Sequence, residues 1–167
     1  MALEILLKVL VMGTNNLNYV LPWNKDDAFH VLDSSRDLLN RIQSKSFPVV
    51  PLLMDAHKDV PRRSGIYFGL TYELVVMYVG KSVCLKNRCY LRNHIQLQTC
   101  LSEGAYLLGW IETLSRHAWA IEQILIAKMK PAVNKGRYQP WWEHYRKLYP
   151  GVKEEVVSFL REDTCDD

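Results

Sequence analysis

The spacing of apolar positions predicts both strands and helices in this chain. Residues 64–70 and 74–80 are rich in β-branched and aromatic side chains, and a Thr-Tyr-Glu link between them predicts a β-hairpin. Residues 104–111 predict a third strand, because Tyr, Leu, Trp and Ile favour extended backbone. Helices are predicted over residues 3–12, 26–45, 83–97, 116–129 and 153–162.

Prolines and short polar residues mark the limits of these elements. Asp33, Ser34 and Ser35 predict a break or a restart inside the second helix, because their side chains compete for backbone hydrogen bonds. Residues 47–51 are predicted to be extended, since a proline disfavours helix at the preceding residue. The chain divides into an N-terminal helical extension (1–62), a core (63–136) and a basic, aromatic C-terminal extension (137–167).

The composition is that of a globular protein. The chain has 167 residues, 49% hydrophobic and 23% charged, which is enough apolar material for a core. A net charge of +3 permits a phosphate-bearing partner but does not require one. No apolar run could span a membrane, and residues 1–13 carry Glu4 and Lys8 without a basic leader. We expect no membrane partner and an intracellular, cytoplasmic location; the oligomeric state is left open.

Two groups of residues have the chemistry of metal ligands but not the spacing. Cys84, Cys89, His94 and Cys100 are separated by four, four and five residues, whereas zinc-binding turns have two-residue gaps. Free, partly packed thiols are the favoured interpretation. The alternating Asp-His-Asp run at positions 55, 57 and 59 is more typical of a solvated loop than of a metal site.

Tyrosines and cations are candidates for chemistry in the core. The hairpin places Tyr67 and Tyr78 close enough to share one face, although strand tyrosines are commonly core residues. On the helix predicted over residues 83–97, Arg88 and Arg92 are stacked neighbours beside an apolar face, and His94 falls roughly opposite. These cations form either a solvated helix face or a phosphate clamp.

Glu122 is an anomaly in the helix predicted over residues 116–129. It lies near the centre of an apolar arc. A carboxylate there is costly unless it is paired, protonated or metal-bound. A functional site is favoured, and an ion pair with Arg88 is the structural alternative.

Five motifs occur in the order and at the spacing of a known family. They are Gly65-Ile66-Tyr67, Tyr78-Val79-Gly80-Lys81-Ser82, Leu85-Lys86-Asn87-Arg88, Glu122, and Pro131-x-x-Asn134. With these motifs the chain resembles the GIY-YIG nuclease family over residues 63–136. The resemblance implies an α/β (α+β) fold: a small three-stranded antiparallel sheet flanked by helices, with a cleft on one sheet face.

The resemblance also implies roles for the matching residues. Glu122 would hold one divalent cation, Mg²⁺ or Mn²⁺ in its place, and Tyr78 or Tyr67 would contact the nucleophilic water. Arg88 would bind the scissile phosphate. Lys81 matches a lysine of the repair enzymes in the family, and Asn134 would brace the site.

One position departs from the family pattern. Four residues after Arg88 the family commonly has His or Tyr, and this chain has Arg92. Either Arg92 replaces that group, or a local bulge brings His94 inward. Both residues are expected to contact DNA.

Further DNA contacts are expected just after Asn134. Cations and aromatic residues alternate there, which suits phosphate neutralisation and base stacking. The alternative is that the tryptophans pack on the core. The residues are Arg137, Tyr138, Trp141, Trp142, His144, Tyr145, Arg146 and Lys147.

The sequence therefore predicts a divalent-metal-dependent endonuclease that hydrolyses phosphodiester bonds in DNA. Restriction, homing and repair types all remain open, and RNA is an alternative substrate. A nucleic-acid-binding module with the same fold but no turnover is the second hypothesis, and a structural protein is the third.

Overall fold

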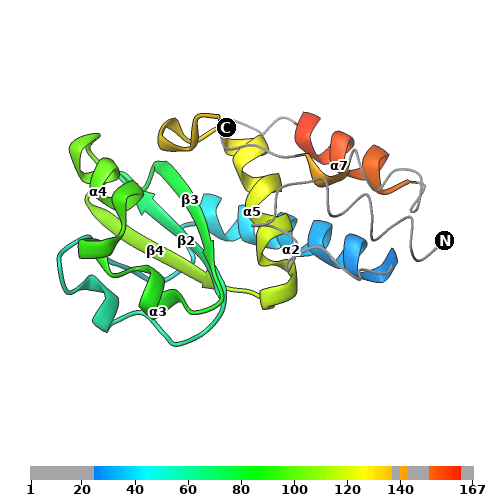
Figure 1. The fold of residues 1–167 in the computed structure, drawn as a ribbon. Coiled ribbons are helices and arrows are strands. Elements are labelled where there is room, and N and C mark those ends of the chain that lie inside the picture. Colours follow the sequence, from blue (N-terminus) through cyan, green and yellow to red (C-terminus); the bar gives the residue numbers. More distant parts are fainter. Residues whose placement is uncertain (1–24, 137–139, 143–150, 163–167) are drawn as a thin grey trace.

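A computed structural model describes residues 25–136, 140–142 and 151–162. A four-stranded antiparallel sheet carries helices on both faces (Figure 1). The helix predicted over residues 3–12, and the expected DNA contacts of Arg137 and Arg146, lie outside the described residues. None of the helices in the described ranges is long and apolar enough to cross a membrane.

The sheet confirms the α+β class but has one strand more than expected. Its strands are β1 (Val49–Pro51), β2 (Gly65–Leu70), β3 (Val76–Ser82) and β4 (Leu107–Glu112), in the order β1-β4-β2-β3. The predicted extended stretch supplies β1, which pairs with β4. A strand ending in proline is tolerated at this position because it is short and lies at the sheet edge.

Alternate residues of the strands face two separate cores. Ile66, Phe68 and Ile111 lie in one core with residues of α2 (Lys25–Gln43), α5 (Ser115–Met129) and α7 (Val152–Arg161). Tyr67 and Trp110 lie in the other core, which also receives residues of four short helices. These are η1 (Ala56–Lys58), α3 (Leu85–Arg88), η2 (Leu91–Asn93) and α4 (Ile95–Ser102).

The break predicted in the second helix is wrong. Helix α2 runs without interruption through Asp33, Ser34 and Ser35. The hydroxyl of Ser35 donates to the carbonyl of Val31 at 2.7 Å, and the side chain is buried. A serine bonded back to the residue four positions earlier is satisfied within the helix, so it does not end it.

The single helix predicted over residues 83–97 is also wrong. The chain forms α3, η2 and α4 instead, and Tyr90 and His94 between them have extended backbone, with ψ of 101° and 90°. The two bends bring Leu85, Leu91 and Leu97 into one core, each 3% exposed or less. Arg88 and Arg92 are therefore not stacked on a common helix.

The C-terminal part packs against the rest of the protein. Trp141 and Trp142 are 1% and 2% exposed, and the indole of Trp141 donates to the carbonyl of Ala120 in α5 at 3.1 Å. The DNA contact expected of Trp141 is thus wrong, because the ring is buried in the core. The predicted final helix is confirmed as α7.

Candidate active site

Two tyrosine–glycine pairs across the hairpin form the floor of the candidate site. Tyr67 pairs with Gly80, and Tyr78 pairs with Gly69, so both aromatic rings project from the same sheet face. Their ring centroids are 5.9 Å apart. A Cβ at position 80 would lie 2.3 Å from the Tyr67 ring. The glycine is required because the ring lies directly over the backbone of β3.

His94 reaches the hydroxyl of Tyr67 from the start of α4. Its Nε2 is 2.6 Å from that oxygen, and the side chain is 1% exposed. Its Nδ1 accepts a hydrogen bond from the backbone N–H of Leu97 at 3.2 Å. A nitrogen that accepts cannot carry a proton, so the neutral ring is protonated at Nε2. His94 therefore donates to Tyr67.

Arg88 supplies a second donor to the same hydroxyl. Its Nε lies 3.3 Å from the Tyr67 oxygen. Burial, and after it Tyr78, raise the pKa of Tyr67 well above its ordinary value, while Arg88 acts in the opposite direction. Because the Tyr67 oxygen accepts from both His94 and Arg88, its own proton is left for the hydrogen bond with Tyr78, which also raises this pKa. The hydrogen bonds run from His94 to Tyr67 to Tyr78.

Glu122 approaches the site from the opposite sheet face, on helix α5. The candidate residues therefore meet around β3, which is an edge strand, and the cleft expected on one sheet face stays a prediction. Burial raises the pKa of the Glu122 carboxyl to about 7, and Lys81, Gln123 and Arg88 act to lower it. The amide of Gln123 donates to the carboxylate at 3.2 Å. Arg88 and Glu122 form no ion pair within 4.0 Å, so that alternative is wrong.

Asn134 fixes the backbone between Tyr78 and Gly80. It lies in η3 (Ala132–Asn134), after α5, and is 4% exposed. Its side-chain oxygen accepts from the N–H of Val79 at 2.8 Å, and its amide donates to the carbonyl of Val79 at 2.9 Å. The side chain thereby takes the place of a neighbouring strand at the free edge of β3.

The structure places the two candidates for the family His/Tyr position, Arg92 and His94, in different surroundings. Arg92 is exposed on η2, whereas His94, between η2 and α4, is turned inward onto Tyr67, as the second alternative expected. Since His94 is 1% exposed, the DNA contact expected of it is wrong. Helical periodicity points His94 the other way, and only the family spacing hinted at this position. Within the described ranges, no group of three or more potential ligands could hold a metal ion. Burial raises the pKa of Cys89 and of Cys100 to about 12, so both are packed thiols.

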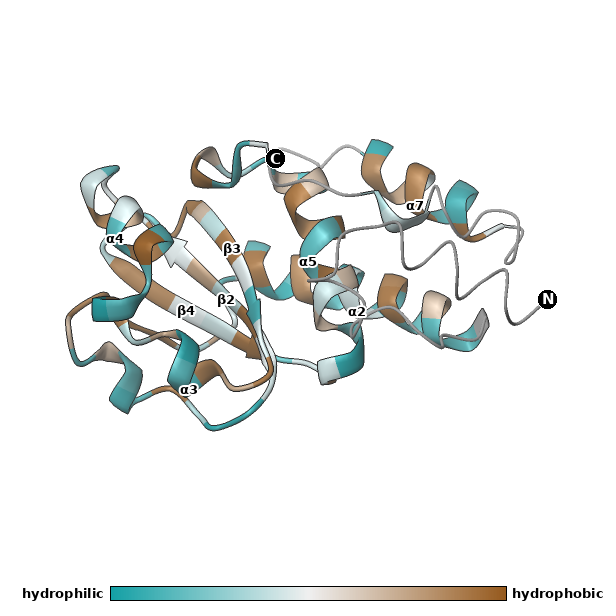
Figure 2. Ribbon diagram, in the orientation of Figure 1, coloured by the Kyte–Doolittle hydropathy of each residue, from teal (hydrophilic) through white to brown (hydrophobic). Residues whose placement is uncertain are grey.

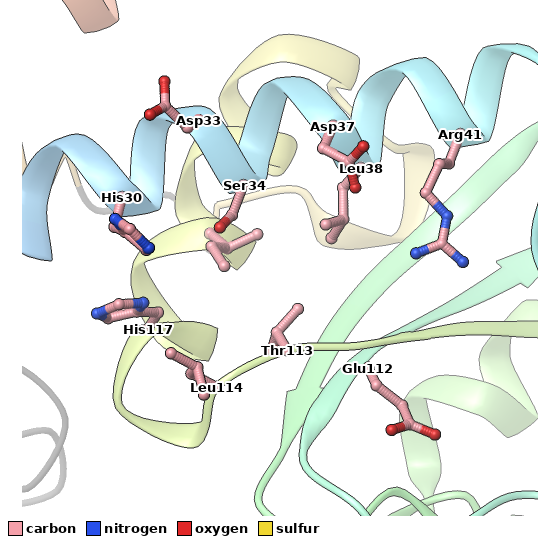
Figure 3. Close-up of a pocket in the computed structure, with 11 residues that line it drawn as sticks. His30, Asp33, Ser34, Asp37, Leu38, Arg41, Glu112, Thr113, Leu114 and His117 are labelled. Atoms are coloured by element: carbon pink, nitrogen blue, oxygen red, sulfur yellow. The ribbon is translucent and has the colours of Figure 1, made fainter.

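A cavity of about 360 Å³ lies away from these residues, between α2 and the start of α5. Figure 3 shows His30 of α2 facing His117 of α5, and the ring centroids are 6.2 Å apart. His117 Nε2 lies 2.8 Å from Asp27, which also pairs with Arg116 at 2.9 Å. None of the motif residues lines this cavity, and its network joins two core helices.

Comparison with protein-family models found no match, and comparison with curated proteins found none either. Solved structures do match. One is the N-terminal GIY-YIG endonuclease domain of UvrC from Thermotoga maritima, bound to magnesium as its catalytic divalent cation. The identity is 27%, with 47% of this chain and 90% of that chain covered, and the TM-score is 0.41.

The chain is similar to GIY-YIG endonuclease domains. A point mutant of the same UvrC domain, also bound to the divalent cation, matches at 24% identity with a TM-score of 0.41. That match covers 56% of this chain and 94% of the other. These structures are of the GIY-YIG family, to which the sequence motifs pointed.

Proposed function

We propose that the protein is a divalent-metal-dependent endonuclease that hydrolyses phosphodiester bonds in DNA. The observation that supports this most is the tyrosine pair Tyr67 and Tyr78, with Arg88 hydrogen-bonded to Tyr67, beside the half-buried carboxylate of Glu122. The set combines a candidate proton acceptor, a fixed guanidinium and a metal-binding oxygen. Hydrolysis of a phosphodiester needs these three groups.

The surroundings of Glu122 fit a hard divalent cation. Burial raises the pKa of this carboxyl to about 7 despite Lys81, Gln123 and Arg88, so its negative charge is only partly compensated. Mg²⁺ is commonly held by one or two carboxylates, with waters and substrate phosphates completing its shell. Glu122 would hold it through one or both oxygens. When bound, the ion would supply positive charge at the phosphate and lower the barrier to attack.

The two tyrosines, Tyr67 and Tyr78, have different roles in the proposed mechanism. The hydroxyl of Tyr67 already accepts from His94 and Arg88 and donates to Tyr78. A hydrogen bond received by Tyr78 stabilises its ionised form. Tyr78 is therefore the group that accepts the proton of the attacking water, and Tyr67 positions it.

Arg88 stabilises the charge that develops on the phosphate. The side chain is exposed, while its Nε is held by Tyr67, so the terminal nitrogens are available to a substrate. A guanidinium fork matches two phosphate oxygens, and its hydrogen bonds strengthen as negative charge builds. Lys81 adds a further cation at the same edge, where it lowers the pKa of Glu122.

Single-turnover cleavage of plasmid, branched, nicked and single-stranded DNA, with RNA as a comparison, tests the proposal. Cleavage should stop with EDTA and return with Mg²⁺ or Mn²⁺. Arg88→Ala should lower the rate about a hundredfold or more while retaining DNA binding, because one transition-state donor is lost. Arg161→Ala, on the distant helix α7, is the control and should cleave normally. Cleavage that persists in EDTA, or a fully active Arg88→Ala, contradicts the mechanism; binding without cleavage by the wild type favours a non-catalytic module.

A further inference from the structure

A basic surface lies beside the candidate site and takes no part in the mechanism above. It comprises Lys58, Arg62, Arg63 and Lys86, which we call the basic rim. The first three precede β2, and Lys86 belongs to α3. Arg62 and Arg63 are exposed, and neither forms an ion pair with another described residue. Lys58 pairs with Asp55 at 3.5 Å, and their side chains are 69% and 63% exposed.

The segment that carries the rim is held rigidly against α3. The N–H of Leu85 donates to the carbonyl of Arg63 at 2.8 Å, and the N–H of Lys86 donates to the carbonyl of Pro61 at 3.1 Å. The ammonium of Lys86 donates to the carbonyl of Lys58 at 3.1 Å. Buried Val60, 2% exposed, anchors the same segment in the core. A preorganised surface loses little conformational entropy when it binds.

Positive charge is concentrated in this part of the chain. With Asp55 included, residues 55–103 contain seven lysines and arginines and four acidic residues, a net charge of +3. Since the whole chain also has a net charge of +3, the remaining residues are neutral overall. Figure 2 shows hydrophilic residues on α3 and on the helical turn beside it. An excess of positive charge in this part of the chain attracts a polyanion.

Resting on the proposed function, we propose that the basic rim binds the DNA backbone phosphates next to the scissile phosphate, without reading base sequence. Two exposed, unpaired arginines can each fork onto phosphate oxygens. The rim adjoins the helix that carries Arg88, because the carbonyls of Pro61 and Arg63 accept hydrogen bonds from the backbone N–H groups of Lys86 and Leu85 in α3. A DNA strand whose phosphate lies at Arg88 therefore has its neighbouring phosphates within reach of the rim. Contacts to phosphates position a duplex but carry no sequence information.

Equilibrium binding of a short duplex in EDTA, at several salt concentrations, tests the rim without any cleavage. The variant is Arg62→Gln with Arg63→Gln, and three unrelated duplex sequences are compared. Each lost phosphate contact makes the negative slope of log affinity against log salt shallower by about 0.9. The slope of the double variant should therefore be shallower by about 1.8. The affinity should fall by the same factor for all three sequences. The charge-matched control, Lys153→Gln with Arg161→Gln on α7, should keep the wild-type slope.

The outcomes separate the rim from the nuclease proposal. If the double variant is folded, as verified by circular dichroism, and keeps the wild-type slope of log affinity against log salt, the proposal that the rim binds phosphates is wrong. A loss confined to one sequence also overturns it, because base readout would then be involved. If the wild-type protein binds duplexes through the rim but cleaves none, phosphate binding by the rim is supported and the proposed nuclease activity is wrong. A wild-type protein that binds no duplex overturns both.

Discussion

At the scale of single residues, the surroundings of Tyr67 explain why its hydroxyl is harder to ionise than that of the neighbouring Tyr78. Its hydroxyl is buried and is already the acceptor for His94 and Arg88. Burial disfavours the phenolate, and so does donation to Tyr78. The capping bond from Leu97 fixes the His94 tautomer, so this histidine is a donor rather than a base. The backbone N–H of Leu97 thus decides that His94 donates to Tyr67, which leaves the hydroxyl proton of Tyr67 for Tyr78.

Glu122→Gln should stabilise the metal-free protein above pH 7. The folded protein holds this carboxyl at a pKa of about 7, against an ordinary value of 4.5. Below pH 4.5 the group is protonated in both states and contributes nothing. Between pH 4.5 and 7 only the unfolded state loses the proton, so the free energy of unfolding of the wild type falls. Above pH 7 the penalty stays constant, at up to about 3.5 kcal/mol, because each pKa unit corresponds to about 1.4 kcal/mol.

Urea unfolding in EDTA at pH 4.5 and pH 8 measures this difference. The gap in unfolding free energy between Glu122→Gln and the wild type should widen from the lower to the higher pH. Glu103→Gln replaces an exposed carboxyl and serves as the control. A gap that does not change with pH shows that the carboxyl of Glu122 is not desolvated in the folded protein.

At the scale of elements, the β2–β3 hairpin places the chemistry at an edge of the sheet. An edge strand leaves backbone groups unpaired, which invites another strand to bind. Asn134 occupies that edge with two hydrogen bonds to Val79. The same contact fixes the end of α5 relative to β3. Edge protection and the relative position of Glu122 and Tyr78 thus depend on one side chain.

Gly80→Ala should displace the ring of Tyr67. The added methyl group would lie 2.3 Å from the ring, which is fixed on its other side by His94 and Arg88. Overpacking of this kind typically costs about 1–3 kcal/mol. We expect a lower free energy of unfolding and an altered near-ultraviolet circular dichroism signal from the tyrosines.

Gly104→Ala is the control for Gly80→Ala, because it also replaces a glycine but places the new methyl group where nothing contacts it. Nothing lies within 4 Å of its Cβ position, but its φ is +92°, so the cost is backbone strain of about 1 kcal/mol. That variant should keep the tyrosine signal. If Gly80→Ala also leaves the signal unchanged, the ring does not lie over the glycine.

At the scale of the whole molecule, parts distant in sequence share one core. Residues of α2 and α7 pack with α5 and with one face of the sheet. In Figure 1 these three helices lie together on the side of the sheet opposite α3 and α4. Arg36 of α2 contacts α7 through Glu162, at 3.4 Å, and through the ring of Phe159. The described parts of both extensions therefore contribute to the core that supports the site.

Trp141→Ala should destabilise the entire fold. The ring is 1% exposed, and its N–H is bonded to Ala120, in the helix that carries Glu122. Removing a buried tryptophan typically costs about 3–5 kcal/mol. Thermal unfolding followed by far-ultraviolet circular dichroism should show a single transition at a lower temperature. Tyr72→Ala, which removes a ring that is 69% exposed, should change it little. An unchanged transition for Trp141→Ala would show that residues 140–142 are not part of the core.

The sequence by itself determined the elements whose signals are local. The hairpin, β4, α2, α5 and α7 follow from side-chain periodicity over a few turns or strand residues. The order and spacing of the motifs also singled out Tyr67, Tyr78, Arg88, Glu122 and Asn134. Periodicity succeeds here because each element buries one face against a neighbour, whichever neighbour that is.

Only the tertiary structure decided which faces meet. It added β1 through pairing with β4, and it split residues 85–102 into three helices so that their apolar residues reach one core. The bend before α4 placed His94 on Tyr67, and packing on α5 buried Trp141. Such choices depend on contacts between residues 20 to 60 positions apart. A local pattern records that a side chain is buried, but the partner is selected by the free energy of the whole packed core.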